Sequence, residues 1–210
     1  MKRIGFLLFF LFATCIPAQA TWDKGFNFRA SSGYVTDGAN TTYSIGEVYP
    51  ITRNSVTFGW DIDRTDSSRD RTTGNDARLA GIVFAANTSG SQTHNFRVDL
   101  AATGTCTIRL GAGDGGTNQR VDLELLDNTT VFATVANNIA VGSNSFLDAT
   151  GTSYSAANWP GSNSTISHTF TSTILFVRLA GLSATTDSSV IAPLFLSCTF
   201  GGVPHRVNSQ

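Results

Sequence analysis

The chain has 210 residues, of which 41% are hydrophobic and 14% charged, with a formal net charge of −1. This composition excludes a disordered, collagen-like or coiled-coil protein, and the length fits one domain. A near-neutral chain without a basic tract also lacks the charge with which proteins bind nucleic acids or anionic membrane surfaces. We therefore expect no nucleic-acid partner.

The first 20 residues are typical of a secretory signal peptide. Lys2 and Arg3 form a short basic segment, residues 4–12 form an apolar run too short to span a bilayer, and residues 18–20 supply a small-residue cleavage site. The mature chain is expected to start at Thr21. No later stretch approaches the roughly 18 uninterrupted apolar residues of a membrane span. These features predict a secreted protein, extracellular or periplasmic, without membrane insertion.

Two cysteines follow the signal peptide, Cys106 and Cys198. In an oxidising compartment such a pair is typical of a disulfide rather than of a metal or redox site. The sequence therefore predicts a disulfide between Cys106 and Cys198, and we assign no cofactor. Closing a loop of roughly 90 residues in this way stabilises a fold by about 4 to 5 kcal/mol on the chain-entropy estimate.

Hydrophobic and polar residues alternate along most of the mature chain. Phe96, Val98 and Leu100, for example, alternate with Arg97 and Asp99. The pattern predicts strands at 25–29, 55–60, 79–85, 96–100, 107–110, 121–125, 130–136, 165–170, 174–180 and 193–200. Turn-forming Gly, Asn, Ser, Thr and Asp separate these segments. The predicted fold class is all-β: a single antiparallel β-sandwich (jelly roll) over residues 21–203, followed by a polar tail at 204–210.

The stretch 61–78 contains five Asp and four Arg. Asp61, Asp63 and Asp66 are spaced like the start of a calcium loop, but Asp66 occupies the position of the required Gly and Thr72 that of the required Glu. This excludes an EF-hand and leaves open an irregular calcium site on the aspartate oxygens. We favour a solvated loop whose arginines pair with its own aspartates, and we assign no metal ligand.

No arrangement typical of a hydrolase is evident. The chain lacks a G-x-S-x-G motif, and His94, His168 and His205 lie in polar turn or tail contexts. Glu47 and Glu124 are the only glutamates that could complement loop aspartates in a glycosidase pair. We therefore assign no catalytic residue, and a polysaccharide lyase or hydrolase is the weakest of the alternatives.

Aromatic residues near polar ones indicate a sugar ligand, because Trp and Tyr rings stack on pyranose faces while Asp, Asn and Arg bind hydroxyls. Three tyrosines, at positions 34, 43 and 49, fall in the first long loop, and we expect Tyr154 and Trp159 on the surface at one end of the sandwich. For Trp60 a core position stays open, because it alternates with Val56 and Phe58. The candidate ligand-binding residues are Trp159, Tyr154, Asn158, Trp60, Asp61 and Tyr34.

The order of several short motifs resembles the galactose-binding-like, malectin-like jelly roll, a module found in many secreted polysaccharide esterases and lyases. The resemblance covers roughly residues 25–114, with a weaker continuation to Phe200. It rests on Phe26-Asn27-Phe28, Phe58-Gly59-Trp60-Asp61, Arg69-Asp70-Arg71, Asp76, Phe96-Arg97-Val98-Asp99-Leu100, Gly104, Thr107-Ile108-Arg109-Leu110 and Gly113-Asp114.

The sequence departs from this family at Asn27, where Asp is usual, at Arg29, where Gly is usual, and at Cys106, where an aromatic residue is common. The last departure implies that a disulfide to Cys198 replaces an aromatic packing contact, and hence that the two cysteine-bearing strands are neighbours. The resemblance implies a β-sandwich and does not by itself define a function.

Together these features predict a secreted, non-catalytic carbohydrate-binding protein that recognises an extracellular or cell-surface polysaccharide. The alternative is a structural or adhesive surface protein that self-associates through its β-sandwich. The expected partner in the first case is a poly- or oligosaccharide, and in the second a further copy of the chain.

Overall fold

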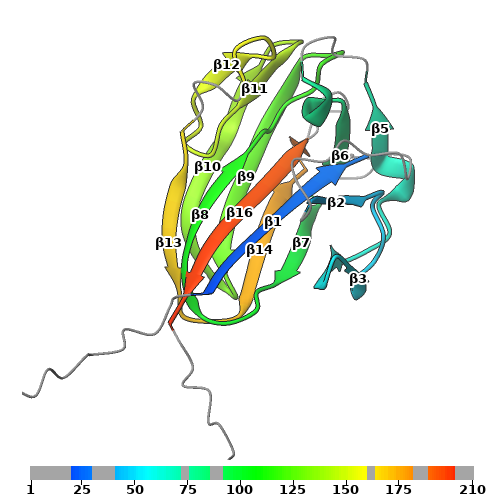
Figure 1. Ribbon diagram of the computed structural model, residues 1–210. Helices are drawn as coiled ribbons and strands as arrows, with labels where there is room; N and C mark the ends of the chain where they lie inside the picture. Colours follow the sequence, from blue (N-terminus) through cyan, green and yellow to red (C-terminus); the bar gives the residue numbers. More distant parts are fainter. Residues whose placement is uncertain are drawn as a thin grey trace, which may run out of the picture.

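The computed structural model describes residues 20–29, 41–71, 76–85, 92–159, 164–181 and 189–201. Two large β-sheets lie face to face (Figure 1). The first sheet has five strands. The strand order is β13 (Ile166–Phe170), β8 (Gly104–Leu110), β16 (Pro193–Phe200), β1 (Ala20–Phe28) and β2 (Thr41–Ser44). In this sheet β1 and β2 run parallel, and the other neighbouring strands run antiparallel.

The second sheet has six antiparallel strands. Their order is β10 (Thr130–Val141), β9 (Gln119–Asp127), β14 (Ile174–Ala180), β7 (Thr93–Asp99), β4 (Val56–Trp60) and β3 (Ile51–Arg53). A small sheet joins β15 (Ser189–Ile191), β6 (Gly81–Ala85) and β5 (Ser68–Asp70), and a hairpin joins β11 (Ser145–Leu147) to β12 (Ser153–Ser155). This architecture confirms the predicted β-sandwich.

Helical structure is confined to two 3-10 turns among the described residues, Thr65–Ser67 and Ala77–Leu79. No helix in these ranges has the length and apolar character that a bilayer crossing needs.

The core lies between the two large sheets and is built from alternate strand residues. Phe96 of β7 is fully buried, and its ring contacts those of Phe28 and Trp60 at centroid distances of 4.8 and 5.2 Å. Phe26 and Phe58 complete this aromatic cluster. Such ring pairs contribute about 0.5–1.5 kcal/mol each beyond the area they bury. The cluster fixes β1, β4 and β7 relative to one another. It therefore also fixes the outward-facing residues that alternate with the buried ones along these strands.

The predicted disulfide is confirmed. Cys106 of β8 and Cys198 of β16 lie directly opposite each other in the strand register, and both are fully buried. The two strands are therefore neighbours, as the resemblance implied. The bond joins residues 92 positions apart in sequence and lies inside the five-stranded sheet.

The longer predicted strands are confirmed, with shifted ends in several cases. Residues 174–180 and 193–200 match β14 and β16, whereas β9 and β10 extend beyond their predicted bounds. Six shorter strands were not predicted from the alternation of residues: β2, β3, β5, β11, β12 and β15. Each has only three or four residues, too few for an alternation to stand out from the surrounding loop.

Asp127, the last residue of β9, ties the six-stranded sheet to the turn between β13 and β14. The backbone N–H and hydroxyl of Thr171 donate to Oδ2 at 2.7 and 2.8 Å. Those of Ser172 donate to Oδ1 at 3.1 and 2.5 Å. Burial raises the pKa of this carboxyl, but the bonds from Ser172 and Thr171 outweigh it and bring the pKa to about 2.

Replacing Asp127 with alanine is expected to lower the free energy of unfolding at pH 7 by about 3 kcal/mol, because four donors lose a charged acceptor. The folded pKa lies below the unfolded value near 3.9. The contribution is therefore complete above about pH 4 and is lost as the pH falls towards 2. Urea unfolding between pH 7 and 2 measures both effects. The exposed Asp23, bonded to Ser197, is the control, and equal losses in the two variants would contradict the prediction.

Candidate functional site

The structure does not bring the predicted ligand-binding residues together on one surface. Trp60 is fully buried, because its strand directs it into the core with Phe58. Trp159 is only 2% exposed and packs in the core, so the prediction that it lies on the surface is wrong. The turn after β12 folds the Trp159 backbone onto Ser155, whose carbonyl accepts from the Trp159 N–H at 3.2 Å, and the Arg78 guanidinium lies 5.4 Å from the ring centroid.

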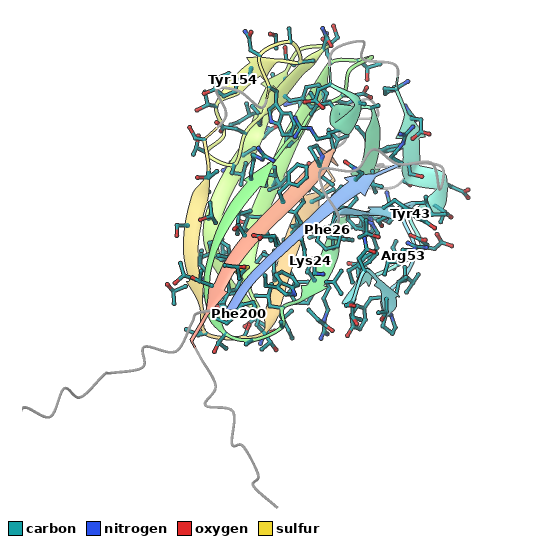
Figure 2. The ribbon with its side chains drawn as sticks, viewed as in Figure 1. Lys24, Phe26, Tyr43, Arg53, Tyr154 and Phe200 are labelled. Atoms are coloured by element: carbon teal, nitrogen blue, oxygen red, sulfur yellow. A yellow bond between two sulfur atoms is a disulfide. The ribbon has the colours of Figure 1, made fainter. Side chains whose placement is uncertain are left out.

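The remaining candidates are more accessible but lie in separate elements. Tyr154 is a half-buried residue of β12, near the upper end of the molecule in Figure 2, and Asn158 is exposed in the following turn. Asp61 is exposed directly after β4. Tyr34 lies outside the described residues. A ligand site made of all six residues is therefore not supported.

Two of the three aspartates considered for a calcium site, Asp61 and Asp63, accept hydrogen bonds from neighbouring donors. Asp61 accepts from the backbone N–H of Asn95 at 2.9 Å, and Asp63 accepts from the N–H and hydroxyl of Thr65 at 2.9 and 2.7 Å. The hydrogen bonds from Thr65 lower the pKa of Asp63. Within the described ranges, no three His, Cys, Asp or Glu side chains gather in a way that could hold a metal ion.

Within the described residues of 61–78, the favoured network of Arg–Asp pairs is confirmed at Arg78, which pairs with Asp76 at 2.7 Å. Arg71 instead reaches Asp114 at 2.9 Å, and Asp70 pairs with Arg29 at 3.1 Å. The prediction of a self-contained network was wrong, because the fold places carboxylates and guanidinium groups from distant segments beside this loop.

The outer face of the six-stranded sheet carries a row of side chains that forms a candidate ligand-binding surface. In β7 and β14 the residues between core positions face outward, and the strand register pairs Arg97 with Phe176 and Asn95 with Arg178. Arg178 is in turn opposite Glu124 of β9, and their side chains form an ion pair at 3.1 Å. Side chains from three adjacent strands therefore form one continuous polar surface.

Tyr49 is placed on this surface by the loop before β3. Its N–H donates to the Trp60 carbonyl at 2.9 Å, which lays the loop across Gly59. Gly59 has a φ of +149°, and a Cβ there would lie 2.4 Å from the Tyr49 nitrogen, so only glycine allows this approach. Because Gly59 is the register partner of Arg97, Tyr49 lies beside Arg97.

Three side chains fix one another at this point. The Tyr49 hydroxyl donates to Asp99 Oδ2 at 2.8 Å, Arg97 Nε donates to Asp99 Oδ1 at 2.7 Å, and the Arg97 guanidinium lies 4.3 Å from the Tyr49 ring centroid. The hydrogen bond to Asp99 raises the pKa of Tyr49, since it stabilises the protonated hydroxyl. Arg97 and Asp99 each keep 30% of their side-chain surface exposed.

Phe176 lies on the other side of Arg97. It is half-buried and faces outward, away from the core that contains its neighbours Leu175 and Val177. Leu126 and Val131 continue the same row on β9 and β10, and Val131 is 40% exposed. We refer to Tyr49, Arg97, Asp99, Phe176, Arg178 and Glu124 together as the sheet-face platform.

Part of the sheet-face platform has a signal in the sequence. In the strand 174–180, Ile174 and Phe176 share a face with Arg178, so apolar residues occur on the face that should be polar. Tyr49 was among the loop tyrosines considered as sugar ligands, but its position over Gly59 depends on a long-range backbone contact that no local pattern reveals.

Comparisons with known proteins reveal only distant likenesses. No protein-family model matches the sequence, and no curated protein matches it either. The chain is similar to the Bacillus subtilis protein YXIM, with a TM-score of 0.49 and 15% identity over 84% of this chain and 40% of that one. It is also similar to a Podospora anserina GH26-CBM35 β-(1,4)-mannanase, with a TM-score of 0.33 and 15% identity over 69% and 27% of the two chains.

A third similar structure is the CBM35 of Paenibacillus barcinonensis, with a TM-score of 0.28 and 12% identity over 55% of this chain and 87% of that one. The present chain thus spans less than half the length of the Bacillus protein and of the mannanase. At this level of similarity, a function has to be inferred from the side chains of the site themselves.

Proposed function

We propose that this protein is an exported, non-catalytic carbohydrate-binding protein that binds an extracellular or cell-surface polysaccharide through the sheet-face platform. One observation carries the proposal. Two aromatic rings outside the core, Tyr49 and Phe176, lie on either side of the Arg97 guanidinium on an otherwise polar sheet face. An aromatic and charged surface of this kind matches the two-sided chemistry of a sugar.

A pyranose ring presents an apolar C–H face and a rim of hydroxyl groups. Aromatic rings bury the apolar face, while ionised side chains form strong hydrogen bonds with hydroxyls. Arg97 and Arg178 are each held by a carboxylate, at 2.7 and 3.1 Å, so their orientation is fixed before a ligand arrives. Such preorganisation reduces the entropy lost on binding.

The dimensions of the sheet-face platform favour a polysaccharide segment over a single terminal sugar. It extends from Tyr49 above β4, across β7 and β14, to Glu124 on β9. Three interstrand spacings amount to about 14 Å. An open surface of that length can contact successive sugars of one chain.

Export agrees with two features of the chain. The Cys106–Cys198 disulfide belongs to a class of bond that persists in oxidising compartments. Residues 1–20 have the composition of a signal peptide, and cleavage after Ala20 leaves almost all of β1 in the mature chain. We therefore place the mature protein outside the cytoplasm, where polysaccharides are accessible.

Self-association through the sandwich is the alternative, and β10 is the strand on which it would depend. β10 is an edge of the six-stranded sheet and exposes Val131 and Ile139. Three register irregularities interrupt its pairing with β9. Irregularities of this kind are a common means of preventing edge-to-edge pairing, so they favour the carbohydrate proposal.

Replacing Phe176 with alanine is expected to weaken binding about tenfold to a hundredfold, by analogy with the 1 to 3 kcal/mol that a stacked ring contributes to base binding. A glycan array identifies the saccharide that the wild-type protein binds, and calorimetry with that saccharide measures the loss. Phe195→Ala is the control in the opposite sheet, where the half-buried Phe195 of β16 packs against the core and lies beside Arg109. Equal losses in both variants, or no glycan bound by the wild type, would contradict the proposal.

A further inference from the structure

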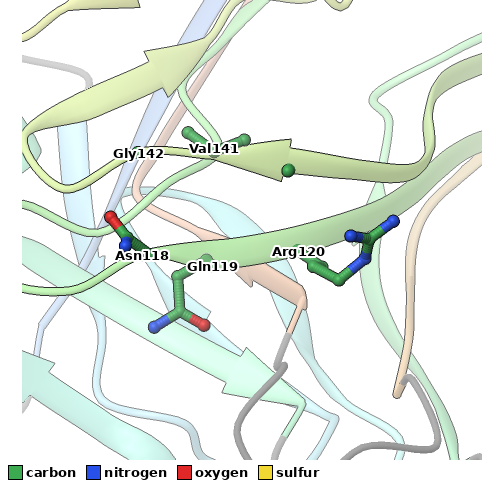
Figure 3. Close-up of a pocket in the computed structure, with 6 residues that line it drawn as sticks. Asn118, Gln119, Arg120, Val141 and Gly142 are labelled. Carbon is green, nitrogen blue, oxygen red and sulfur yellow. The ribbon is translucent and has the colours of Figure 1, made fainter.

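A pocket of about 360 Å³ lies between the start of β9 and the end of β10 (Figure 3). Its lining residues are Asn118, Gln119, Arg120, Ala140, Val141 and Gly142. The volume is within the lower part of the range of small-molecule sites. None of the six lining residues is acidic, and one carries a positive charge. The pocket therefore differs in chemistry from the sheet-face platform, where each arginine has a carboxylate partner.

Arg120 is held in place by a neutral residue. Its Nε and Nη2 donate to the side-chain and backbone oxygens of Asn138, at 2.5 and 2.8 Å. Asn138 adopts a left-handed conformation with φ of 54°, which asparagine tolerates better than most residues. In the described part of the chain, no carboxylate forms an ion pair with Arg120, and no acceptor bonds its Nη1. The guanidinium is thus positioned without being neutralised.

Other arginines that anchor loops and strands differ from Arg120 because they are held by a carboxylate. Each of the following pairs with a carboxylate: Arg29, Arg53, Arg71, Arg78, Arg97 and Arg178. Asp122, the next outward residue after Arg120 on β9, does not line the pocket. Burial and the nearby charge of Glu124 raise the pKa of Asp122.

A second donor accompanies Arg120. Asn118 Oδ1 accepts from the Ser143 N–H at 2.7 Å, which fixes the amide and leaves Nδ2 as the group available to a ligand. Asn118 directly precedes β9, and Arg120 is the second residue of that strand. Both line the pocket, and Figure 3 shows the Gln119 side chain directed away from them. Two N–H donor groups, one of them charged, therefore border the same pocket.

We propose that this pocket is a separate binding site for a small oxyanion, a carboxylate or sulfate group, with Arg120 Nη1 and Asn118 Nδ2 as donors. Arginine matches the geometry of such groups and binds them with charge-assisted hydrogen bonds. Ala140, Val141 and Gly142 complete the lining, and a Cβ at Gly142 would have only Ser145 Oγ within 4 Å. The site is independent of the sheet-face platform, so failure of one proposal leaves the other intact.

The test is an NMR titration of the whole protein with sodium sulfate, against sodium chloride at equal ionic strength. Sulfate is expected to give saturable amide shifts at 118–120 and 138–142. Arg120→Gln, which keeps a donor for Asn138 but removes the charge, is expected to weaken binding at least about tenfold. Arg109→Gln changes the net charge equally on the opposite sheet and is expected to leave binding unchanged. Non-saturating shifts, or equal affinity in Arg120→Gln and wild type, would overturn the proposal.

A variant that fills the pocket and a second anion provide two further tests. Gly142→Leu is expected to abolish sulfate binding without disturbing the fold, since a Cβ at 142 meets only Ser145 Oγ, at 3.9 Å. Full affinity in a folded Gly142→Leu protein would place the anion elsewhere and contradict the proposal. Sodium acetate in place of sulfate distinguishes the source: tighter acetate binding assigns the pocket to carboxylates, and tighter sulfate binding assigns it to sulfate esters.

Discussion

Replacing both Cys106 and Cys198 with alanine is expected to lower the free energy of unfolding by about 4 to 5 kcal/mol, the chain-entropy estimate for this loop. The bond joins residues 92 positions apart, and both sulfur atoms are fully buried between paired strands. For a domain of this size the loss corresponds to a fall in Tm of about 10 to 15 °C. Thermal unfolding of the double variant and of the oxidised wild type measures the difference.

The cause is established by two controls. Mass spectrometry of the non-reduced wild type should show the cross-linked peptides and no free thiol. Unfolding the wild type in a strong reductant should reproduce the Tm of the double variant, because both lack the same constraint. Two alkylatable thiols in the natively exported protein, or equal Tm values with and without the bond, would be incompatible with this account.

Trp159→Ala is expected to lower the free energy of unfolding by about 3 to 5 kcal/mol, the usual cost of removing a buried Trp or Phe side chain. The ring is 2% exposed and packs in the main core, although the surrounding segment is rich in polar residues. Chemical denaturation of the purified variant gives the value.

The matched variant is Tyr154→Ala in the preceding strand. Tyr154 is half-buried, so its truncation should destabilise the fold much less than that of Trp159. An unchanged stability in Trp159→Ala would instead place the ring on the surface and restore Trp159 as a candidate for sugar stacking. The two variants together therefore decide between a core and a ligand-binding role.

The sheet architecture could be predicted because burial in a sandwich imposes a period of two on long strands. Phe96 and Val98 are buried and Arg97 and Asp99 face outward, as their alternation requires. The alternation of Val56, Phe58 and Trp60 likewise indicated that Trp60 could lie in the core, where it is found. The β-sandwich implied by the galactose-binding-like resemblance is confirmed, whereas the malectin-like and esterase associations stay predictions.

The candidate site was less predictable because it depends on contacts between distant segments. Trp159 has polar neighbours in sequence, and only the fold of the turn after β12 shows that its ring is buried. Tyr49 reaches the sheet face through a backbone bond to Trp60, and its hydroxyl partner, Asp99, is 50 residues away in sequence. Local patterns determine which face a strand residue occupies but not which loop crosses that face.

The most direct test of the central claim is to map, by amide chemical shifts, where the saccharide identified on the glycan array binds. We expect the largest shifts on the outward residues of β7, β14 and β9, around Arg97, Phe176 and Glu124, and at Tyr49. We also expect these shifts to disappear in Phe176→Ala at the same saccharide concentration. Shifts concentrated instead around Tyr154 and Asn158, or on the outer face of the five-stranded sheet, would contradict it.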